Sequence, residues 1–232
     1  MRSYVITLTN NDESIQGALR LVDSAKNSGN TFNIKTFEAV IPEQVDTMMN
    51  HYGIRWNWPW ESGAPDIQSG IFKQAYLTAN KNRRIACFLS HYKLWRDCAG
   101  SNEPLMIFEH DAYVTRRIEW EKFEECGFQV IGLNDPRRAT RKSDIYHQKV
   151  QEQSGFCVAA PKIDMDNIAQ GLAGNSAYYI KPEGAKKLLE LVDEYGAWPN
   201  DAIMCRQLMP RRLGQVREYC TTIQSMVSTT KT

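Results

Sequence analysis

The fold class is decided near the start of the chain, where residues 4–40 read YVITLTNNDESIQGALRLVDSAKNSGNTFNIKTFEAV. Residues 4–9 are rich in β-branched side chains, which favour a strand. Residues 14–27 then carry apolar side chains at the spacing of one helical face, and Gly29 follows them. Residues 32–40 are β-rich again. Because a strand, a helix and a second strand in this order build parallel sheets, the sequence predicts an α/β fold.

Further elements extend this sheet along the chain. Residues 85–98 predict a mostly buried helix, with Cys87 and His91 on one stripe. A second helix is expected between Pro182 and Gly196, since proline favours a helix start and glycine follows its end. The remaining predicted elements are strands at 105–109, 129–133 and 177–180 and a charged helix near 118–125.

Two stretches lack a period and are expected to be irregular. Residues 41–84 contain HYGIRWNWPWESGAP and predict a tryptophan-rich insert. Residues 134–149 are polar, with four basic residues between Arg137 and Lys142, and predict a surface loop. No repeat, low-complexity run or linker divides the sequence, so a single domain over residues 1–232 is expected.

Composition limits the classes of function. Lys plus Arg number 28 and Asp plus Glu 27, so the formal net charge of +1 argues against binding a polyanion through bulk electrostatics. The six cysteines include no C-x-x-C pair, so neither zinc spacing nor a disulfide framework is indicated. No window approaches the about 18 consecutive apolar residues of a membrane helix, and no signal peptide is recognisable. A cytoplasmic protein with free thiols and no membrane span is expected.

Two carboxylates follow the most strand-like segment, LMIFEHDAYV at 105–114. Alternation along an extended strand would place Glu109 and Asp111 on one side and His110 on the other. If the backbone turns before Asp111, this alternation fails and His110 itself could reach the metal. Neighbouring carboxylates raise each other's pKa, and a divalent cation such as Mg²⁺ or Mn²⁺ removes that conflict. Ligands of open α/β sheets also bind beyond the carboxyl ends of strands. The sequence therefore indicates a metal site, with helix capping or simple exposure to solvent as the alternative.

The surrounding sequence resembles a known family. Residues 84–112, RIACFLSHYKLWRDCAGSNEPLMIFEHDA, resemble the central block of glycosyltransferase family 25, which reads approximately C-x-x-S-H-x-x-x-W, a spacer, and a strand ending in Glu-Asp-Asp. TFEAV at 36–40 is similar to an early strand of the family, and residues 174–204 are similar to its Gly-Thr-x-x-Tyr and Pro-x-Asp segments. The residues that fall on the central pattern are Cys87, Ser90, His91, Trp95, Glu109 and Asp111.

The resemblance implies a GT-A-like nucleotide-sugar transferase fold, with a mixed, mainly parallel sheet flanked by helices. The implied reaction is metal-dependent, inverting transfer of a hexose, galactose or glucose, from a nucleotide sugar such as a UDP-sugar to a hydroxyl of a glycan or lipid-linked saccharide. Glu109 and Asp111 would hold Mn²⁺ or Mg²⁺ beside the donor diphosphate. Asp201 would accept the proton of the acceptor, with capping of a helix over 202–208 as its alternative role.

The chain departs from the family pattern in two places. His110 replaces the middle carboxylate, although the Asp/Glu-x-Asp form of the GT-A metal motif is retained. NNDESIQ at 10–16 stands where family members commonly carry an arginine pair. How this chain holds the donor diphosphate is therefore open. The basic residues Lys81, Arg83 and Arg84 either approach the diphosphate or form an exposed turn.

Other residues are expected to contact the substrates. His91 is either a buried structural histidine or lies beside the nucleotide together with Ser90. Trp58 and Trp60 offer flat apolar faces on which an acceptor sugar can stack, or they pack as a lid. The expected donor contacts are Thr7, Leu8, Ser90, His91 and Glu109.

Two other functions are compatible with the same residues. A non-catalytic nucleotide-sugar or glycan binding protein would keep the fold and lose the chemistry when the middle carboxylate became His110. A transferase acting on modified nucleobases in DNA would use the basic residues at 137–142 on phosphates. The near-zero net charge makes a nucleic-acid partner the less favoured alternative.

Overall fold

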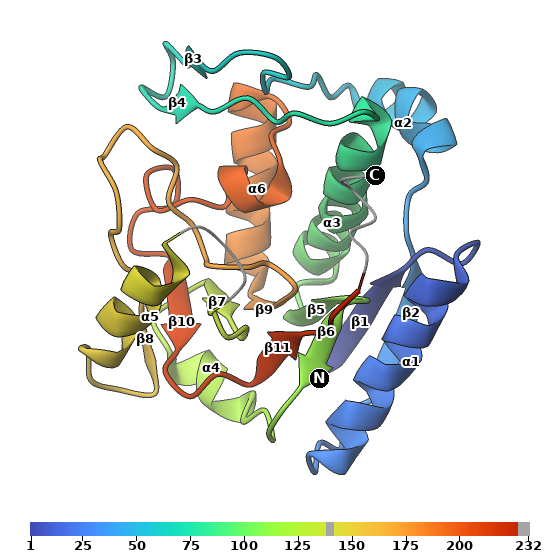
Figure 1. The fold of residues 1–232 in the computed structure, drawn as a ribbon, viewed down its shortest axis with the longest axis vertical. Coiled ribbons are helices and arrows are strands. Elements are labelled where there is room, and N and C mark those ends of the chain that lie inside the picture. Colours follow the sequence, from blue (N-terminus) through green and yellow to red (C-terminus); the bar gives the residue numbers. More distant parts are fainter. Residues whose placement is uncertain (138–141, 227–232) are drawn as a thin grey trace.

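The computed structural model describes residues 1–137 and 142–226, and Figure 1 shows how the helices surround a central sheet. The predicted opening unit is present as strand β1 (Arg2–Thr7), helix α1 (Asp12–Asn27) and strand β2 (Ile34–Glu38). Strands β1 and β2 pair in parallel, as a strand, helix, strand unit requires. The prediction of an α/β fold is therefore confirmed.

The central sheet is mixed. Its order within the described residues is β2, β1, β5, β9, β7, β10, β8. β5 pairs in parallel with β1, and β10 with β7, whereas β9 is antiparallel to both its neighbours and β8 to β10. Five of the seven strands thus point the same way, which confirms a mainly parallel sheet. The remaining strands are β5 (Leu105–Glu109), β7 (Val130–Gly132), β8 (Cys157–Ala159), β9 (Ala177–Ile180) and β10 (Leu213–Val216).

Side chains alternate across the sheet and feed a core on each face. Leu105 and Ile107 of β5 belong to the hydrophobic cluster that includes helices α3 (Lys81–Ser101) and α6 (Pro182–Tyr195). The intervening side chains of β5, at 106 and 108, belong to the cluster that includes α1. α3 and α6 pack side by side in Figure 1. β5 is thus buried on both faces, and its carboxyl end is held rigidly.

The stretch 41–84 is more ordered than expected. A short 3-10 turn, η1 (Pro42–Gln44), leads into helix α2 (Val45–Tyr52), which ends at Gly53 with a left-handed φ of 65°. Eight residues are too few for a recognisable helical period, which is why the sequence did not predict α2. The two short strands β3 (Ala64–Pro65) and β4 (Phe72–Lys73) form a small hairpin in the remainder.

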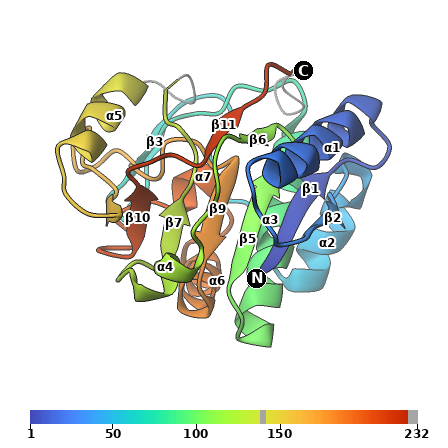
Figure 2. The same ribbon diagram turned by 90° about the horizontal axis from the view of Figure 1, so that it is seen from below.

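The second half of the predicted 134–149 loop is also helical. Helix α5 (Ser143–Gln151) buries Tyr146 and Val150, one turn apart, against Val158 and Ala173. A single apolar pair is too weak a pattern to predict a helix, because tertiary packing rather than periodicity stabilises it. Of the basic residues at 137–142, those at 138–141 lie outside the described residues, so their predicted contact with phosphates stays a prediction. Figure 2 shows α5 and α1 at opposite ends of the molecule.

Four short elements in the described part of the chain, two strands and two helices, complete the fold. Strand β6 (Ala112–Val114) pairs antiparallel with β11 (Thr221–Ile223), so the chain turns back directly after β5. Helix α4 (Glu121–Glu125) is a shorter form of the helix predicted near 118–125. Helix α7 spans only Asn200–Ile203. None of the helices in the described ranges is long and apolar enough to cross a membrane.

Candidate active site

A cavity of about 780 Å³ lies at the carboxyl ends of β1 and β5. Its walls come from the segments after β1, β2 and β5, the first turns of α3, the loop before β9, and helix α7. This is where open α/β sheets bind ligands. The cavity brings together six of the residues predicted from the sequence: Leu8, Ser90, His91, Glu109, Asp111 and Asp201.

The two carboxylates predicted to bind metal both face this cavity. β5 ends at Glu109, and His110 and Asp111 form the turn into β6. The strand alternation therefore stops before Asp111, and the expectation that His110 lies on the other side is wrong, because the turn brings all three residues to the cavity wall. Burial and then the charge of Glu109 raise the pKa of Asp111 to about 7. One carboxylate oxygen of Asp111, Oδ1, is buried without a hydrogen-bond partner.

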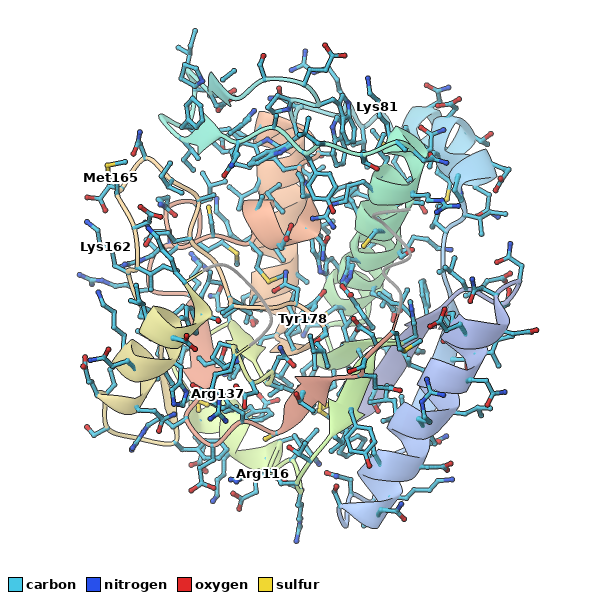
Figure 3. The ribbon with its side chains drawn as sticks, in the orientation of Figure 1. Lys81, Arg116, Arg137, Lys162, Met165 and Tyr178 are labelled. Atoms are coloured by element: carbon cyan, nitrogen blue, oxygen red, sulfur yellow. The ribbon has the colours of Figure 1, made fainter. Side chains whose placement is uncertain are left out.

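His91 connects the cavity to the core. Its Nε2 lies 3.1 Å from Oε1 of Glu109, and its Nδ1 lies 2.8 Å from the hydroxyl of Tyr178. The indole of Trp95 donates to the same hydroxyl at 2.9 Å. Because that hydroxyl then has its own proton to give to Nδ1, we assign the imidazole proton to Nε2, from which it is donated to Glu109. Figure 3 shows Tyr178 near the centre of the molecule.

This chain of hydrogen bonds sets the charge of Glu109. Burial raises the pKa of Glu109, but the hydrogen bond from His91 and the nearby positive charge of Arg84 outweigh it, and the pKa is lowered overall. His91 is a buried, hydrogen-bonded structural histidine, as one of its two weighed roles requires, and it also lines the cavity. Its place beside the nucleotide stays a prediction. Glu109 is thus kept ionised, whereas its neighbour Asp111 is about half protonated near pH 7.

Asp201 lines the cavity from α7 and forms an ion pair with Arg84. One guanidinium nitrogen of Arg84, Nη2, is 3.1 Å and 3.3 Å from the two carboxylate oxygens. Asp201 is the second residue of α7, whose N-cap is Pro199, so the alternative role as N-cap of a helix over 202–208 is wrong. Its side chain is 52% exposed, so an acceptor can approach the carboxylate. Arg84 also stacks on Tyr76 at 4.1 Å, which fixes its position.

Two further residues of the cavity wall were not predicted. Asn175 and Ser176 precede β9 and are 7% and 5% exposed, yet both amide atoms of Asn175 and the hydroxyl of Ser176 have no hydrogen-bond partner among the described residues. Buried polar atoms are normally hydrogen-bonded, so these groups indicate a polar ligand or bound water. The signal in the sequence was their place directly after Gly174, where the family carries Gly-Thr.

Some of the residues expected to contact the donor form hydrogen bonds within the protein instead. The hydroxyl of Ser90 accepts from the amide of Val40 and donates to the carbonyl of Ala86, each at 2.9 Å. Thr7 is buried, donates to the carbonyl of Val5 and does not line the cavity. The amide of Leu8, which does line it, donates to the Ser14 hydroxyl. Their roles in donor binding stay predictions.

The tryptophans of the insert lie outside this cavity lining. Trp60 stacks on Trp56 with ring centroids 5.1 Å apart and an interplanar angle of 8°, and Trp58 packs on Trp198 at 5.3 Å. All three insert tryptophans pack against the core beside α3 and α6. These contacts agree with a packed cover, and acceptor binding by Trp58 and Trp60 stays a prediction.

Comparison with known proteins identifies the class to which this site belongs. A model of glycosyltransferase family 25, described as a family of LPS biosynthesis proteins, matches residues 1–204. The chain therefore belongs to glycosyltransferase family 25, which confirms the resemblance and the prediction that it is a glycosyltransferase. A search of curated proteins finds no relative with significant sequence similarity.

Among solved structures, the chain is similar to the galactosyltransferase LgtC in complex with donor and acceptor sugar analogues, at 10% identity and a TM-score of 0.48. The match covers 98% of this chain and 88% of LgtC. An active-site mutant of LgtC gives a TM-score of 0.49 with the same identity and coverage. Mouse xyloside xylosyltransferase 1 in its apo form gives 0.43 at 11% identity, with 91% of this chain and 83% of that chain covered.

Proposed function

We propose that this glycosyltransferase moves galactose or glucose from a UDP-sugar to a hydroxyl of a glycan or lipid-linked saccharide, with inversion at the anomeric carbon. The observation that carries the proposal is one cavity lined both by the Glu109 and Asp111 carboxylates, at the end of β5, and by the Asp201 carboxylate, on α7. Inverting transfer needs a stabilised leaving group and a base on the acceptor side, and this arrangement offers groups for both.

A divalent cation, Mn²⁺ or Mg²⁺, fits the first pair of carboxylates. Asp111 has a buried oxygen without a partner and a pKa raised to about 7 beside the charge of Glu109. A cation would coordinate the unpartnered oxygen of Asp111 and would cancel the electrostatic repulsion between the two carboxylates. Hard cations prefer such oxygen ligands. When bound, the ion would neutralise charge that develops on the diphosphate leaving group.

Arg84 and its neighbours would hold the donor. Arg83 and Arg84 stand at the start of α3 and line the cavity, in place of the arginine pair that family members carry after the first strand. The unpartnered groups of Asn175 and Ser176 offer hydrogen bonds to sugar hydroxyls. Donor binding would thus use both cationic and neutral polar side chains.

Asp201 would serve as the base. As the acceptor oxygen attacks the anomeric carbon, its proton passes to the Asp201 carboxylate while the bond from that carbon to the UDP oxygen breaks. The ion pair with Arg84 orients this carboxylate before the acceptor binds. Transfer of the proton competes with the ion pair, so one of the two Arg84 contacts must lengthen.

The test is transfer from UDP-galactose and UDP-glucose to lipooligosaccharide-type acceptors, with Mn²⁺, Mg²⁺ or a chelator, followed by assignment of the product anomer by NMR. Asp111→Asn should lose the metal-stimulated rate. Asp135→Asn is the matched control, because Asp135 pairs with Arg137 outside the cavity. A retained anomeric configuration, or a full rate with the chelator present, would contradict the inverting, metal-dependent mechanism.

A further inference from the structure

A second set of possible metal ligands lies in the same cavity. Cys87, His91 and Glu109 place a thiol, a ring nitrogen and a carboxylate oxygen within 4.8 Å of one another. Cys87 and His91 stand four residues apart on α3, so both point from the same helical face. Glu109 meets them from the end of β5. All three line the cavity, which leaves further coordination positions open to solvent or a ligand.

The chemistry of this set differs from that of the carboxylate pair. Thiolate, imidazole and carboxylate together are ligands of Zn²⁺ and similar thiophilic ions, whereas Mn²⁺ and Mg²⁺ prefer oxygen. Three protein ligands and an open position are typical of accessible zinc sites. The sequence spacing gave no sign of this, because the third ligand comes from another element and no C-x-x-C pair exists.

The surroundings already orient these ligands. The His91 ring stacks on Tyr178 at 5.7 Å and is hydrogen-bonded to it through Nδ1, which turns Nε2 towards Glu109. Histidines that bind metals usually donate their other ring N–H to such a partner. A metal ion at Nε2 therefore requires the imidazole proton to move from Nε2 to Nδ1, where the Tyr178 hydroxyl can accept it. The Cys87 thiol makes one weak contact, 3.8 Å to Oδ1 of Asn200. Burial and the charge of Glu109 raise its pKa to about 12, so a metal ion must displace the thiol proton when it binds.

We propose that Cys87, His91 and Glu109 form a binding site for Zn²⁺ or a similar thiophilic divalent ion, and that this ion excludes the hard cation because both sites need Glu109. The binding itself does not depend on the proposed function, and only the competition between the two ions rests on it. Zinc would then inhibit the transferase by withdrawing Glu109 from the donor site.

The direct test uses Co²⁺ as a spectroscopic substitute for Zn²⁺ on the full, metal-free chain. Bound Co²⁺ should show thiolate-to-metal charge transfer and the strong visible bands of a low-coordinate site, and Zn²⁺ should bleach both. Cys87→Ser should remove the charge-transfer band and weaken Zn²⁺ binding more than about tenfold, the lower limit found for losing even an outer partner. Cys98→Ser is the matched control, since Cys98 is a buried thiol on the same helix away from the cluster.

A second measurement needs no variant. Zn²⁺ should slow alkylation of Cys87 in the wild-type chain, read by peptide mass spectrometry, and leave the rate at Cys126 unchanged. No charge-transfer band in the wild type, a band that persists in Cys87→Ser, or no protection of Cys87 would overturn the site. If Co²⁺ binds as expected but no UDP-sugar is turned over, the proposed function fails and the zinc site stands. If transfer occurs and is metal-dependent but the band is missing, the zinc site fails alone.

Discussion

At the scale of single residues, the site depends on how its carboxylates are held in different charge states. Glu109 keeps its charge through His91, Asp111 is pushed towards the neutral form, and Asp201 forms an ion pair with Arg84. Environments that shift the pKa values of neighbouring carboxylates in opposite directions are typical of functional sites, where such groups have distinct chemical roles. Each carboxylate can therefore be tested by a different measurement.

The first residue-scale prediction concerns the proposed base. Asp201→Asn should lower kcat by roughly 10²–10⁴-fold, because the amide cannot accept the proton, while the Kd for UDP stays unchanged. Steady-state kinetics and calorimetric titration with UDP check both parts. Asp193→Asn, an exposed carboxylate on α6, is the control and should keep the wild-type rate. A variant of Asp201 with normal kcat would remove this residue from the mechanism.

The second concerns the pH dependence of the metal-free protein. The pKa of Asp111 rises from 3.8 to about 7 on folding, so the folded state holds a proton that the unfolded state releases between these values. Stability contributed at this position is therefore present at low pH and lost as pH rises from about 4 to 7, by at most about 4 kcal/mol at about 1.4 kcal/mol per pKa unit. Denaturant unfolding of wild type and Asp111→Asn across this range isolates the effect. If the free energy of unfolding changed equally with pH in the two proteins, the raised pKa of Asp111 would be contradicted.

At the scale of elements, the turn after β5 is positioned by close packing against α1. A Cβ atom at Gly17 would lie 2.6 Å from the carbonyl oxygen of His110, closer than such atoms approach. Gln224 links the same parts, since its amide donates to the carbonyls of Gly17 and Ala112 at 3.0 Å and 2.8 Å. The turn that carries Asp111 is thus set by a contact between elements far apart in the sequence.

Gly17→Ala should accordingly destabilise the protein by about 1–3 kcal/mol, the usual cost of overpacking, and should also reduce activity because the turn is displaced. Thermal unfolding and transfer kinetics measure the two effects. Gly100→Ala on α3 is the control, and its change in the free energy of unfolding should have the opposite sign, since no described atom lies within 4 Å of the added methyl group. Replacing a helical glycine there should stabilise by about 0.5–1 kcal/mol. Similar effects at both positions would contradict the close contact.

At the scale of the whole molecule, the cavity is assembled from segments spread over most of the chain, from Ile6 to Met226. A ligand that bridges these segments binds only the folded state and therefore raises its stability. The same cavity must accommodate nucleotide, cation and acceptor in the proposed reaction. Ligand-induced stabilisation is thus a direct measure of whether the site is formed in solution.

We expect UDP at about 100 times its Kd, with Mn²⁺, to stabilise the chain by about 2.7 kcal/mol. For a protein of this size that corresponds to a rise in Tm of roughly 5–10 °C, measured by differential scanning fluorimetry. UDP with a chelator should give a much smaller rise, and Asp111→Asn should remove the difference. An equal shift with and without Mn²⁺ would indicate that the nucleotide binds without a cation.

Local patterns were enough to predict the α/β class, five of the seven described strands of the central sheet and the residues of the central family block. Those features follow from local periodicity and from short motifs that need no partner, as in the segment 105–109 and the helix that begins at Pro182. Elements held mainly by distant contacts were missed, and α2 and α5 are the examples. Each is too short for its own pattern to outweigh the polar residues around it.

Only the tertiary structure decided which side chains meet. His91 is hydrogen-bonded to Glu109 and Tyr178, and Arg84 forms an ion pair with Asp201. The buried, unpartnered atoms of Asn175 belong to a residue of the cavity wall. These contacts link residues between 18 and 117 positions apart. Charge state, burial and coordination depend on distances in space, and a sequence read in local windows carries no information about them.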